Sequence, residues 1–326
     1  MMLFLHLFNT LDYQGLFRPL IYIGDKPLVY YLSLFGDACV PIFAFVSGYG
    51  LYINVVSDPK RYRKKNGDRL LKLYINYWIV LVLFVAILGL SLQFPEYPGH
   101  WIKFLLNATG VVNNYNGAWW FFLIYILLVL SSPVLFTWVR RSPGYLVLGI
   151  SATLYLIGFY FRVYRPGTWN NAVLQWLHTN AALYGCVLLP FIAGALSFKY
   201  KINTRVTNAF SRTRYPSLIA SAGILLLIVF HGLVPNFIVA PITGLLFIFL
   251  FNQIQLPAVV SRTLLWCAPH ATNMWLIHMF FYLIYFRDFI YGFRYVPLIF
   301  MVLVVASVLS SFIINIIQNR LQKLIS

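Results

Sequence analysis

The chain has 326 residues, of which 61% are hydrophobic and only 10% are charged. Its mean hydropathy is +0.79, whereas an ordinary soluble domain carries about 25% charged residues, so the composition excludes a soluble protein. The net charge of +17 does not indicate nucleic-acid binding, because the basic residues lie in short segments between apolar runs. The three cysteines lie within apolar runs and predict buried thiols rather than disulfides.

Apolar runs of bilayer length recur along the chain. A spanning helix needs roughly 20 apolar residues, and these runs lack the two-residue alternation of a membrane barrel. We therefore predict an all-α, polytopic transmembrane bundle of about ten spans that forms a single domain over residues 1–326. The predicted spans are 1–11, 34–56, 73–92, 117–138, 143–160, 180–198, 216–231, 236–252, 263–286 and 295–318.

The first span is the shortest of the ten. Asp12 follows so soon that the apolar run covers about half a bilayer, and we expect this span to be truncated. Residues 94–116 and 162–178 are expected to form polar or re-entrant loops.

Lys and Arg are unevenly divided between alternate loops. If the loop 57–72 is cytoplasmic, 17 of the 24 basic side chains fall on the cytoplasmic side and 7 on the opposite side. By the positive-inside rule this division predicts a multi-pass protein of the cytoplasmic membrane whose C-terminus is cytoplasmic. For the cluster at 60–65, topology and contact with anionic membrane lipids are favoured over a phosphate-binding rim for a nucleotide-like donor.

Two ionisable side chains occur early in the chain at similar expected depth. His6 lies in the apolar segment MMLFLHLFN, and ionisable groups at membrane depth usually face the bundle interior and serve a function. A histidine that only hydrogen-bonds to a neighbouring helix is the alternative. Asp37, near the outer end of the second span, could orient the His6 imidazole for general-base work, or face water.

The segment FAFVSGYG lies within the second span. Gly48 permits close helix approach and Ser47 can hydrogen-bond between helices, so this segment, which includes Tyr49, is more typical of packing than of a site. At the start of the third span, Arg69 and Lys72 lie three residues apart on one helical face. They could bind phosphates of a nucleotide-like donor, or serve only topology and lipid contact.

Two later segments combine aromatic and polar residues. Trp119 lies in NGAWWFF at a membrane edge, where aromatic belts are ordinary. His278 lies in the middle of an apolar span, in WLIH. Too few Cys, His and carboxylate residues cluster to predict a metal site.

In their order, these segments resemble the membrane acyltransferase-3 family, the bacterial O-acyltransferases of surface glycans. The resemblance rests on the histidine of the first helix and on FAFVSGY, RLLKLYINYW, WWFFLIY and WLIH, which extend over nearly the whole chain. The family pattern also places a basic residue upstream of the histidine, at a position that precedes Met1. Activity of this N-terminally short form is therefore a separate question from membership.

The resemblance implies transfer of an acyl group, acetyl in particular, from cytoplasmic acyl-CoA to a sugar hydroxyl. The acceptor would be a cell-surface polysaccharide or its lipid-linked precursor. The family's catalytic histidine falls on His6, its S-G-Y on Ser47 to Tyr49, its basic segment on Arg69 and Lys72, and its late histidine on His278. Two other classes fit the topology: a glycan or lipid transporter or flippase, and a non-catalytic membrane partner.

Overall fold

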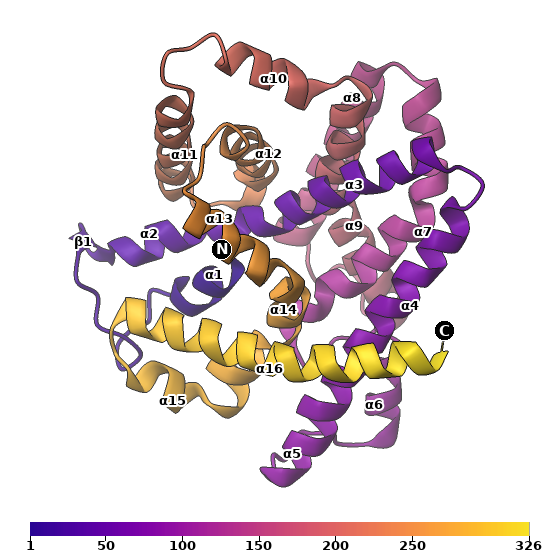
Figure 1. Ribbon diagram of the computed structural model, residues 1–326. Helices are drawn as coiled ribbons and strands as arrows, with labels where there is room; N and C mark the ends of the chain where they lie inside the picture. Colours follow the sequence, from indigo (N-terminus) through magenta and orange to yellow (C-terminus); the bar gives the residue numbers. More distant parts are fainter. Residues whose placement is uncertain (326) are drawn as a thin grey trace. The chain divides into compact units, whose positions relative to one another are not determined.

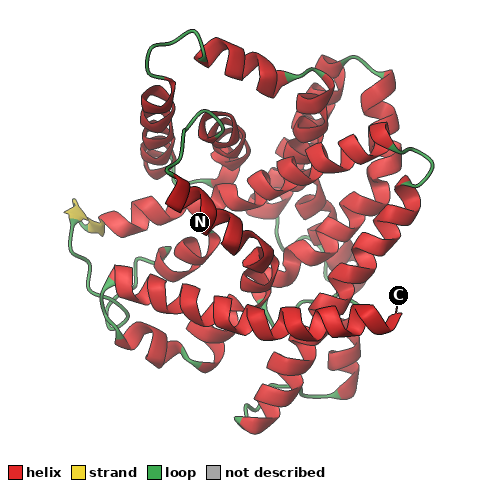
Figure 2. Cartoon of the chain, viewed as in Figure 1, coloured by secondary structure: helices red, strands yellow, loops and turns green. Residues whose placement is uncertain are grey.

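The computed structural model describes residues 1–325 and divides into two compact units. Unit 1 comprises residues 34–66 and 124–255 together with Met1, and unit 2 comprises 2–33, 67–123 and 256–326. Helices form 78% of the structure, and the strands β1 (Tyr22–Ile23) and β2 (Lys26–Pro27) form one short antiparallel hairpin (Figure 2). The predicted all-α bundle is thereby confirmed.

The helices of unit 1 come from two separate stretches of the chain (Figure 1). They are η1 (Phe35–Ala38, a 3₁₀ turn), α3 (Cys39–Ser57), α7 (Trp120–Arg141), α8 (Gly144–Tyr164), α9 (Ala172–Lys199), α10 (Ile202–Phe210), α11 (Pro216–Leu233), η4 (Phe237–Val239, a 3₁₀ turn) and α12 (Ala240–Phe251). Helix α9 is the centre of this unit, because 72% of its most apolar 18-residue segment is buried, whereas the corresponding share for α11 is 17%. It packs against both α3 and α8.

Unit 2 contains more short and irregular helices. They are α1 (Met2–Phe8), α2 (Leu28–Leu34), α4 (Tyr62–Val80, which begins in unit 1), η2 (Leu81–Ile87, π-helical), α5 (Leu88–Ser91), α6 (Trp101–Ala108), η3 (Gly117–Trp119, a 3₁₀ turn), α13 (Ala258–Cys267), η5 (Ala268–His270, a 3₁₀ turn), α14 (Ala271–Met279), η6 (Phe280–Tyr285, π-helical), α15 (Arg287–Gly292) and α16 (Val296–Ile325). The core of unit 2 joins α1 to α16 and to the segment that follows α14.

Seven helical stretches of the described chain are long and apolar enough to span a membrane. They are Leu28–Ser57, Tyr62–Ser91, Gly117–Arg141, Gly144–Tyr164, Ala172–Lys199, Pro216–Leu233 and Val296–Lys323, and each contains most of one predicted span. Most extend beyond the apolar run, since helical structure continues into polar sequence where the backbone hydrogen bonds allow it.

The other three predicted spans are shorter or interrupted. The first corresponds to the seven residues of α1, and the eighth to a 15-residue apolar stretch, Phe237–Phe251. The predicted span 263–286 is not one continuous α-helix, because η5 separates α13 from α14 and η6 follows α14. Pro269 lies at the first break, and proline lacks the N–H that would continue the helical ladder.

Both predicted loops are wrong in part. Residues 101–108 form α6, because the His100 side chain accepts a hydrogen bond from the Ile102 N–H and caps the helix. Between α8 and α9 only residues 165–171 are non-helical, since Asn171 caps α9 through the N–H groups of Val173 and Leu174. Short polar caps inside loops explain why hydropathy alone did not reveal these helices.

Candidate active site

Helix α1 holds His6 beside the core of unit 2. Leu3 and Leu7 are four residues apart, lie on one helical face and are buried together with Phe8. The Tyr291 hydroxyl donates a hydrogen bond of 3.2 Å to the Leu7 carbonyl and anchors the end of the helix. His6 is half-buried, so its ring lies between core and surface.

His278 lies on α14 with its side chain fully buried, and its ring partner is His6. The His6 Nδ1 and His278 Nε2 atoms are 2.8 Å apart, and the ring centroids are 4.9 Å apart at an interplanar angle of 29°. The Tyr282 ring stacks on that of His278 at 5.9 Å and lies 6.3 Å from that of His6. The structure therefore brings together two residues that are 272 positions apart in the sequence.

The backbone determines which nitrogens of the two rings carry protons. His278 Nδ1 lies 2.8 Å from the Trp275 carbonyl and 3.1 Å from that of Met274, and a carbonyl oxygen can only accept. His278 Nδ1 is therefore the donor, and in a neutral ring Nε2 is the acceptor. His6 Nδ1 must then donate to it, which makes Nε2 the acceptor nitrogen of His6. A general base needs such an acceptor nitrogen.

Trp119 contacts the helix that carries His278. Its side chain is 1% exposed, so it does not belong to an aromatic belt, and its indole N–H donates to the Leu276 carbonyl at 2.9 Å. Asn116, which sequence reasoning missed, donates to the same carbonyl at 3.1 Å. Because asparagine is common in loops, its place three residues before a tryptophan gave no signal.

Asp37 lies in unit 1, where its neighbour is a second buried histidine. Its Oδ2 is 3.8 Å from Nε2 of His231, which is fully buried on α11. The Nδ1 of His231 lies 3.1 Å from the Thr243 hydroxyl of α12. The pairing of Asp37 with His6 would connect the two units and stays a prediction. His231 was missed because it lies at the end of a predicted span, where a histidine is unremarkable.

The SGY segment packs α3 against α9. A Cβ atom on Gly48 would lie 1.9 Å from the Phe191 carbonyl oxygen, and one on Gly194 would lie 2.1 Å from that of Phe45. Only glycine permits such an approach of two backbones. Ser47 is half-buried, and the ring of Tyr49 meets that of Phe198 edge-on at 5.5 Å. These contacts favour the packing interpretation.

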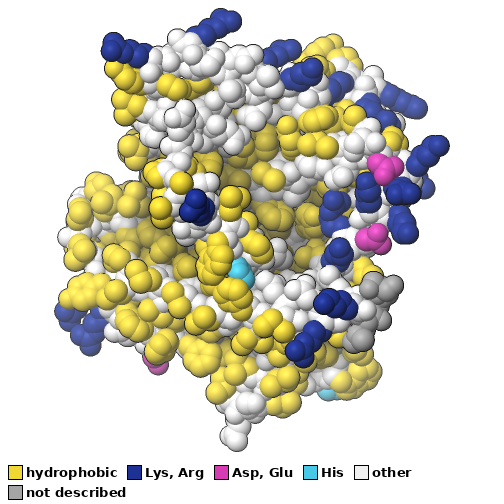
Figure 3. Space-filling model, in the orientation of Figure 1, with side chains coloured by type: hydrophobic (Ala, Val, Ile, Leu, Met, Phe, Trp, Pro, Cys, Tyr) yellow, Lys and Arg dark blue, Asp and Glu magenta, His cyan; other side chains and the backbone are white. Residues whose placement is uncertain are grey.

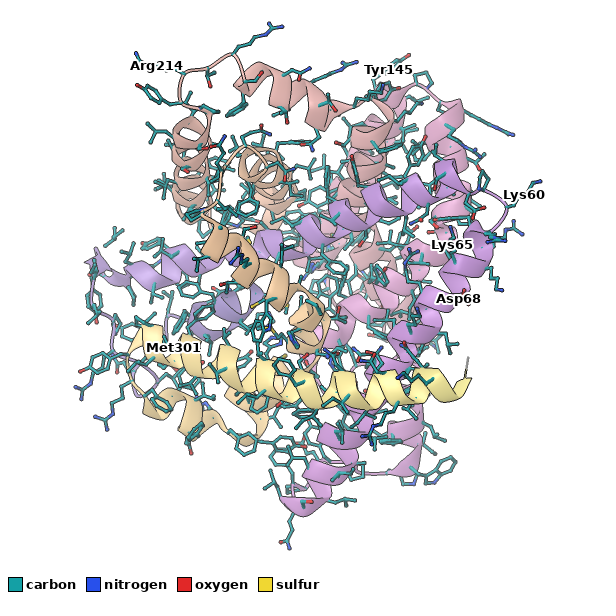
Figure 4. All side chains as sticks on the ribbon, in the orientation of Figure 1. Lys60, Lys65, Asp68, Tyr145, Arg214 and Met301 are labelled. Atoms are coloured by element: carbon teal, nitrogen blue, oxygen red, sulfur yellow. The ribbon has the colours of Figure 1, made fainter. Side chains whose placement is uncertain are left out.

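The basic cluster contains side chains of different exposure. Lys60 and Lys65 project from the region that joins α3 to α4 (Figure 4), and Lys65 forms an ion pair of 3.1 Å with Asp58. The hydrogen bond from Lys65 holds the pKa of the Asp58 carboxyl below its ordinary value. Arg69 is half-buried on α4, whereas Lys72 is exposed.

A buried amide network crosses unit 2 near the histidine pair. Asn76 of α4 donates to Asn273 of α14 at 2.5 Å, and Asn273 donates to Ser311 and Asn315 of α16, each at 2.8 Å. The ring of His270 joins through the Ser311 hydroxyl. Asparagines inside apolar runs were a readable signal of this helix–helix network, since polar groups at membrane depth require partners.

Over residues 1–325, no group of three or more His, Cys, Asp or Glu side chains is arranged to hold a metal ion. The fold is that of a polytopic helical membrane protein. The paired rings of His6 and His278 present an acceptor nitrogen, Nε2 of His6. The family model described as "Acyltransferase domain" matches residues 1–316, so the chain belongs to the membrane acyltransferase-3 family. It is thus a membrane acyltransferase. No curated protein and no solved structure matches the chain.

Proposed function

We propose that the protein transfers an acetyl group from cytoplasmic acetyl-CoA to a sugar hydroxyl of a cell-surface polysaccharide or its lipid-linked precursor. It would do so in the bacterial cytoplasmic membrane, with its C-terminus in the cytoplasm. The observation that carries the proposal is the hydrogen-bonded pair of His6 and His278, whose proton order leaves Nε2 of His6 as an acceptor. Membership of an acyltransferase family supplies the reaction class.

The proposed reaction needs one base and one pathway for its proton. A sugar hydroxyl is a poor nucleophile at neutral pH, and His6 Nε2 takes its proton as the oxygen attacks the thioester carbonyl. The C–O bond forms, the C–S bond breaks, and the same proton passes from His6 to the departing CoA sulfur. His278 accepts the hydrogen bond from His6 Nδ1 throughout and so stabilises the transient imidazolium.

The donor is held by its phosphates in this proposal. Arg69 and Lys72 lie one helical turn apart on α4, and Arg69 is half-buried, so its guanidinium can bind phosphate oxygens in a bidentate manner. We propose direct transfer to the acceptor without a covalent acyl-enzyme, since the sequence shows no nucleophile-elbow motif. Asp37 would tune the base only if its carboxylate reaches the His6 ring.

The test replaces the His6 ring while keeping the helix. His6→Gln can hydrogen-bond but cannot accept the proton, and His6→Ala removes the ring entirely. In membranes that contain the full chain, both should lower transfer of label from [¹⁴C]acetyl-CoA to the glycan fraction by about 10² or more, the smallest effect expected for a lost base. Both should remain folded, since His6 is half-buried and lies at the edge of the core.

The matched control is His100→Gln, the same exchange at a histidine that caps α6 on the surface. It should retain transfer per folded molecule within about twofold, because the lost cap costs about 1 kcal/mol of stability at a site that takes no part in the proposed chemistry. Full acetyl transfer by a well-folded His6→Gln protein would refute the proposed mechanism. Loss of transfer in His100→Gln alone would show that the assay reports folding rather than chemistry.

A further inference from the structure

The carbonyl of Leu276 accepts two side-chain hydrogen bonds in the interior of unit 2. The indole of Trp119 and the amide of Asn116 both donate to it, at 2.9 and 3.1 Å, and both side chains are almost completely buried. In a continuous α-helix this oxygen would accept from the N–H of Phe280. That N–H is instead directed to Ile277 and His278, so α14 ends here and π-helical η6 begins.

The contact between η3 and α14 is reciprocal. The Trp275 indole donates to the Ala118 carbonyl at 3.0 Å, while the Ala118 N–H is directed to the Asn116 side-chain oxygen at 2.9 Å. Asn116 therefore uses its oxygen to cap η3 and its nitrogen to hold α14. This arrangement fixes the rotation of α14 about its own axis, because each segment donates a side-chain N–H to a backbone carbonyl of the other.

Three successive carbonyls of α14 accept side-chain hydrogen bonds. Those of Met274 and Trp275 accept from Nδ1 of His278, and that of Leu276 accepts from Trp119 and Asn116. The His278 ring and the two carbonyls that hold its Nδ1 belong to the same helix, so a shift of this turn would carry Nε2 of His278 away from Nδ1 of His6. The proton order of the histidine pair depends on that contact, and a misplaced reacting group costs about 10²-fold for a displacement of 1 Å.

We propose that Trp119 and Asn116 are positioning residues that orient the His278 ring and thereby direct the acceptor nitrogen of His6 away from the pair. The catalytic consequence rests on the proposed function, but the orientation of the ring does not. Packing alone does not explain why a tryptophan and an asparagine occupy these two positions. The rings next to Trp119 are those of Tyr77 at 4.8 Å and Phe280 at 5.8 Å, and neither contact needs an N–H donor.

The experiment removes the donors while keeping the packing. Trp119→Phe keeps an aromatic ring without the N–H. Asn116→Ser keeps a short acceptor for the cap of η3 but is too short to reach Leu276. The matched control is Trp78→Phe, because the Trp78 indole also donates to a backbone carbonyl, that of Ala108 at 2.8 Å, at a site on α6 away from α14.

Two measurements are made on the full chain in lipid bilayers. Solid-state NMR of ¹⁵N-histidine reports which His278 nitrogen is protonated, with His278→Asn to assign the signal. In Trp119→Phe and Asn116→Ser the hydrogen bond that His278 Nε2 accepts from His6 should weaken, and the ¹⁵N signal of that nitrogen should shift toward that of an unbonded acceptor, whereas Trp78→Phe should match the parent protein. Apparent kcat for [¹⁴C]acetyl-CoA, with a membrane glycan fraction as acceptor, should fall about 10- to 100-fold while KM stays unchanged.

The outcomes separate this inference from the proposed function. If the two variants change the ¹⁵N spectrum but the parent protein itself shows no acetyl transfer, the positioning stands and the proposed activity is refuted. An unchanged spectrum and an unchanged kcat per folded molecule in both variants would overturn the positioning, whatever His6→Gln does. If both variants misfold under conditions where Trp78→Phe folds, then the hydrogen bonds hold the bundle together. That result would also overturn the positioning role.

Discussion

Among the basic residues near the start of α4, Arg69 differs from its neighbours in exposure. It is half-buried, whereas Lys64 is exposed, as expected of a side chain that meets water or lipid headgroups. A half-buried guanidinium forms stronger charge-assisted hydrogen bonds than an exposed ammonium, since the surrounding dielectric is lower. This difference makes Arg69 the residue at which the proposed donor site can be tested against a purely topological role.

We therefore expect Arg69→Ala to raise KM for acetyl-CoA by about tenfold or more, with kcat little changed. Loss of a hydrogen bond to a charged group costs about 1.5–3 kcal/mol, which corresponds to that factor. Lys64→Ala is the matched control and should change KM by less than about twofold, because exposed ion pairs contribute little. Steady-state kinetics of the two purified variants provide the measurement. Equal, small effects at both positions would assign the whole cluster to topology.

Each histidine of the site could be selected from the sequence, but their contact could not. His6 and His278 are polar residues in apolar runs, and that contrast marks them. Their pairing depends on how α1 and α14 pack in unit 2, and no local pattern encodes it. Asp37 was chosen as an orienting carboxylate from depth alone. Depth along a span does not say which helix a side chain faces, and within its unit Asp37 faces His231.

At the scale of helices, α3 and α9 approach so closely that their backbones touch. Gly48→Ala would place a methyl group 1.9 Å from the Phe191 carbonyl oxygen, so the two helices must separate. Overpacking of this kind costs about 1–3 kcal/mol. We expect the free energy of unfolding, measured by denaturation of the purified protein in mixed micelles, to fall by that amount.

Gly50→Ala on the same helix is the control for that substitution. No atom lies within 4 Å of the Cβ position at Gly50, so alanine meets no obstacle and gains about 1 kcal/mol of helix propensity. Its free energy of unfolding should equal or exceed that of the parent protein. If both substitutions destabilise the protein equally, then the loss comes from the helix itself and not from contact with α9.

Long apolar helices were predictable because each carries its own signal. All seven stretches of the described chain that could span a membrane contain most of a predicted span. The interruption of 263–286 was not predictable to the same degree. Pro269 marks the break before α14, but the end of α14 depends on hydrogen bonds from Trp119 and Asn116, which lie far away in the sequence. Tertiary contacts of this kind override local helical propensity.

For the chain as a whole, the surface is as apolar as a bilayer requires. Hydrophobic side chains gather over the first part of α16 (Figure 3), where Met301 is 59% exposed. An exposed apolar surface of this extent would make a soluble monomer aggregate, whereas in lipid it needs no further partner. Membrane lipids are therefore the first partners that the structure indicates.

The expected orientation in the membrane rests on helices that are long enough to span a bilayer. Four stretches that qualify as spans lie between Ser57 and Tyr200: Tyr62–Ser91, Gly117–Arg141, Gly144–Tyr164 and Ala172–Lys199. Because four is an even number, the segments before and after them must lie on the same side. The loops 57–72 and 199–215 hold 12 of the 24 basic residues, so by the positive-inside rule we expect both to lie in the cytoplasm. Neither the short α1 nor the interrupted 263–286 region is among these four stretches.

Labelling of single cysteines in intact cells tests this orientation. In a chain without its three native cysteines, Lys64→Cys and Arg205→Cys should resist a membrane-impermeant maleimide until the cells are opened. Glu96→Cys and Pro166→Cys lie in segments that an odd number of spans separates from them, and all four positions are exposed, so these two should react from outside. Labelling at Lys64 but not Glu96 in intact cells would invert the orientation. Acetyl-CoA would then meet Arg69 on the wrong side of the membrane, and the proposed donor site would fail with it.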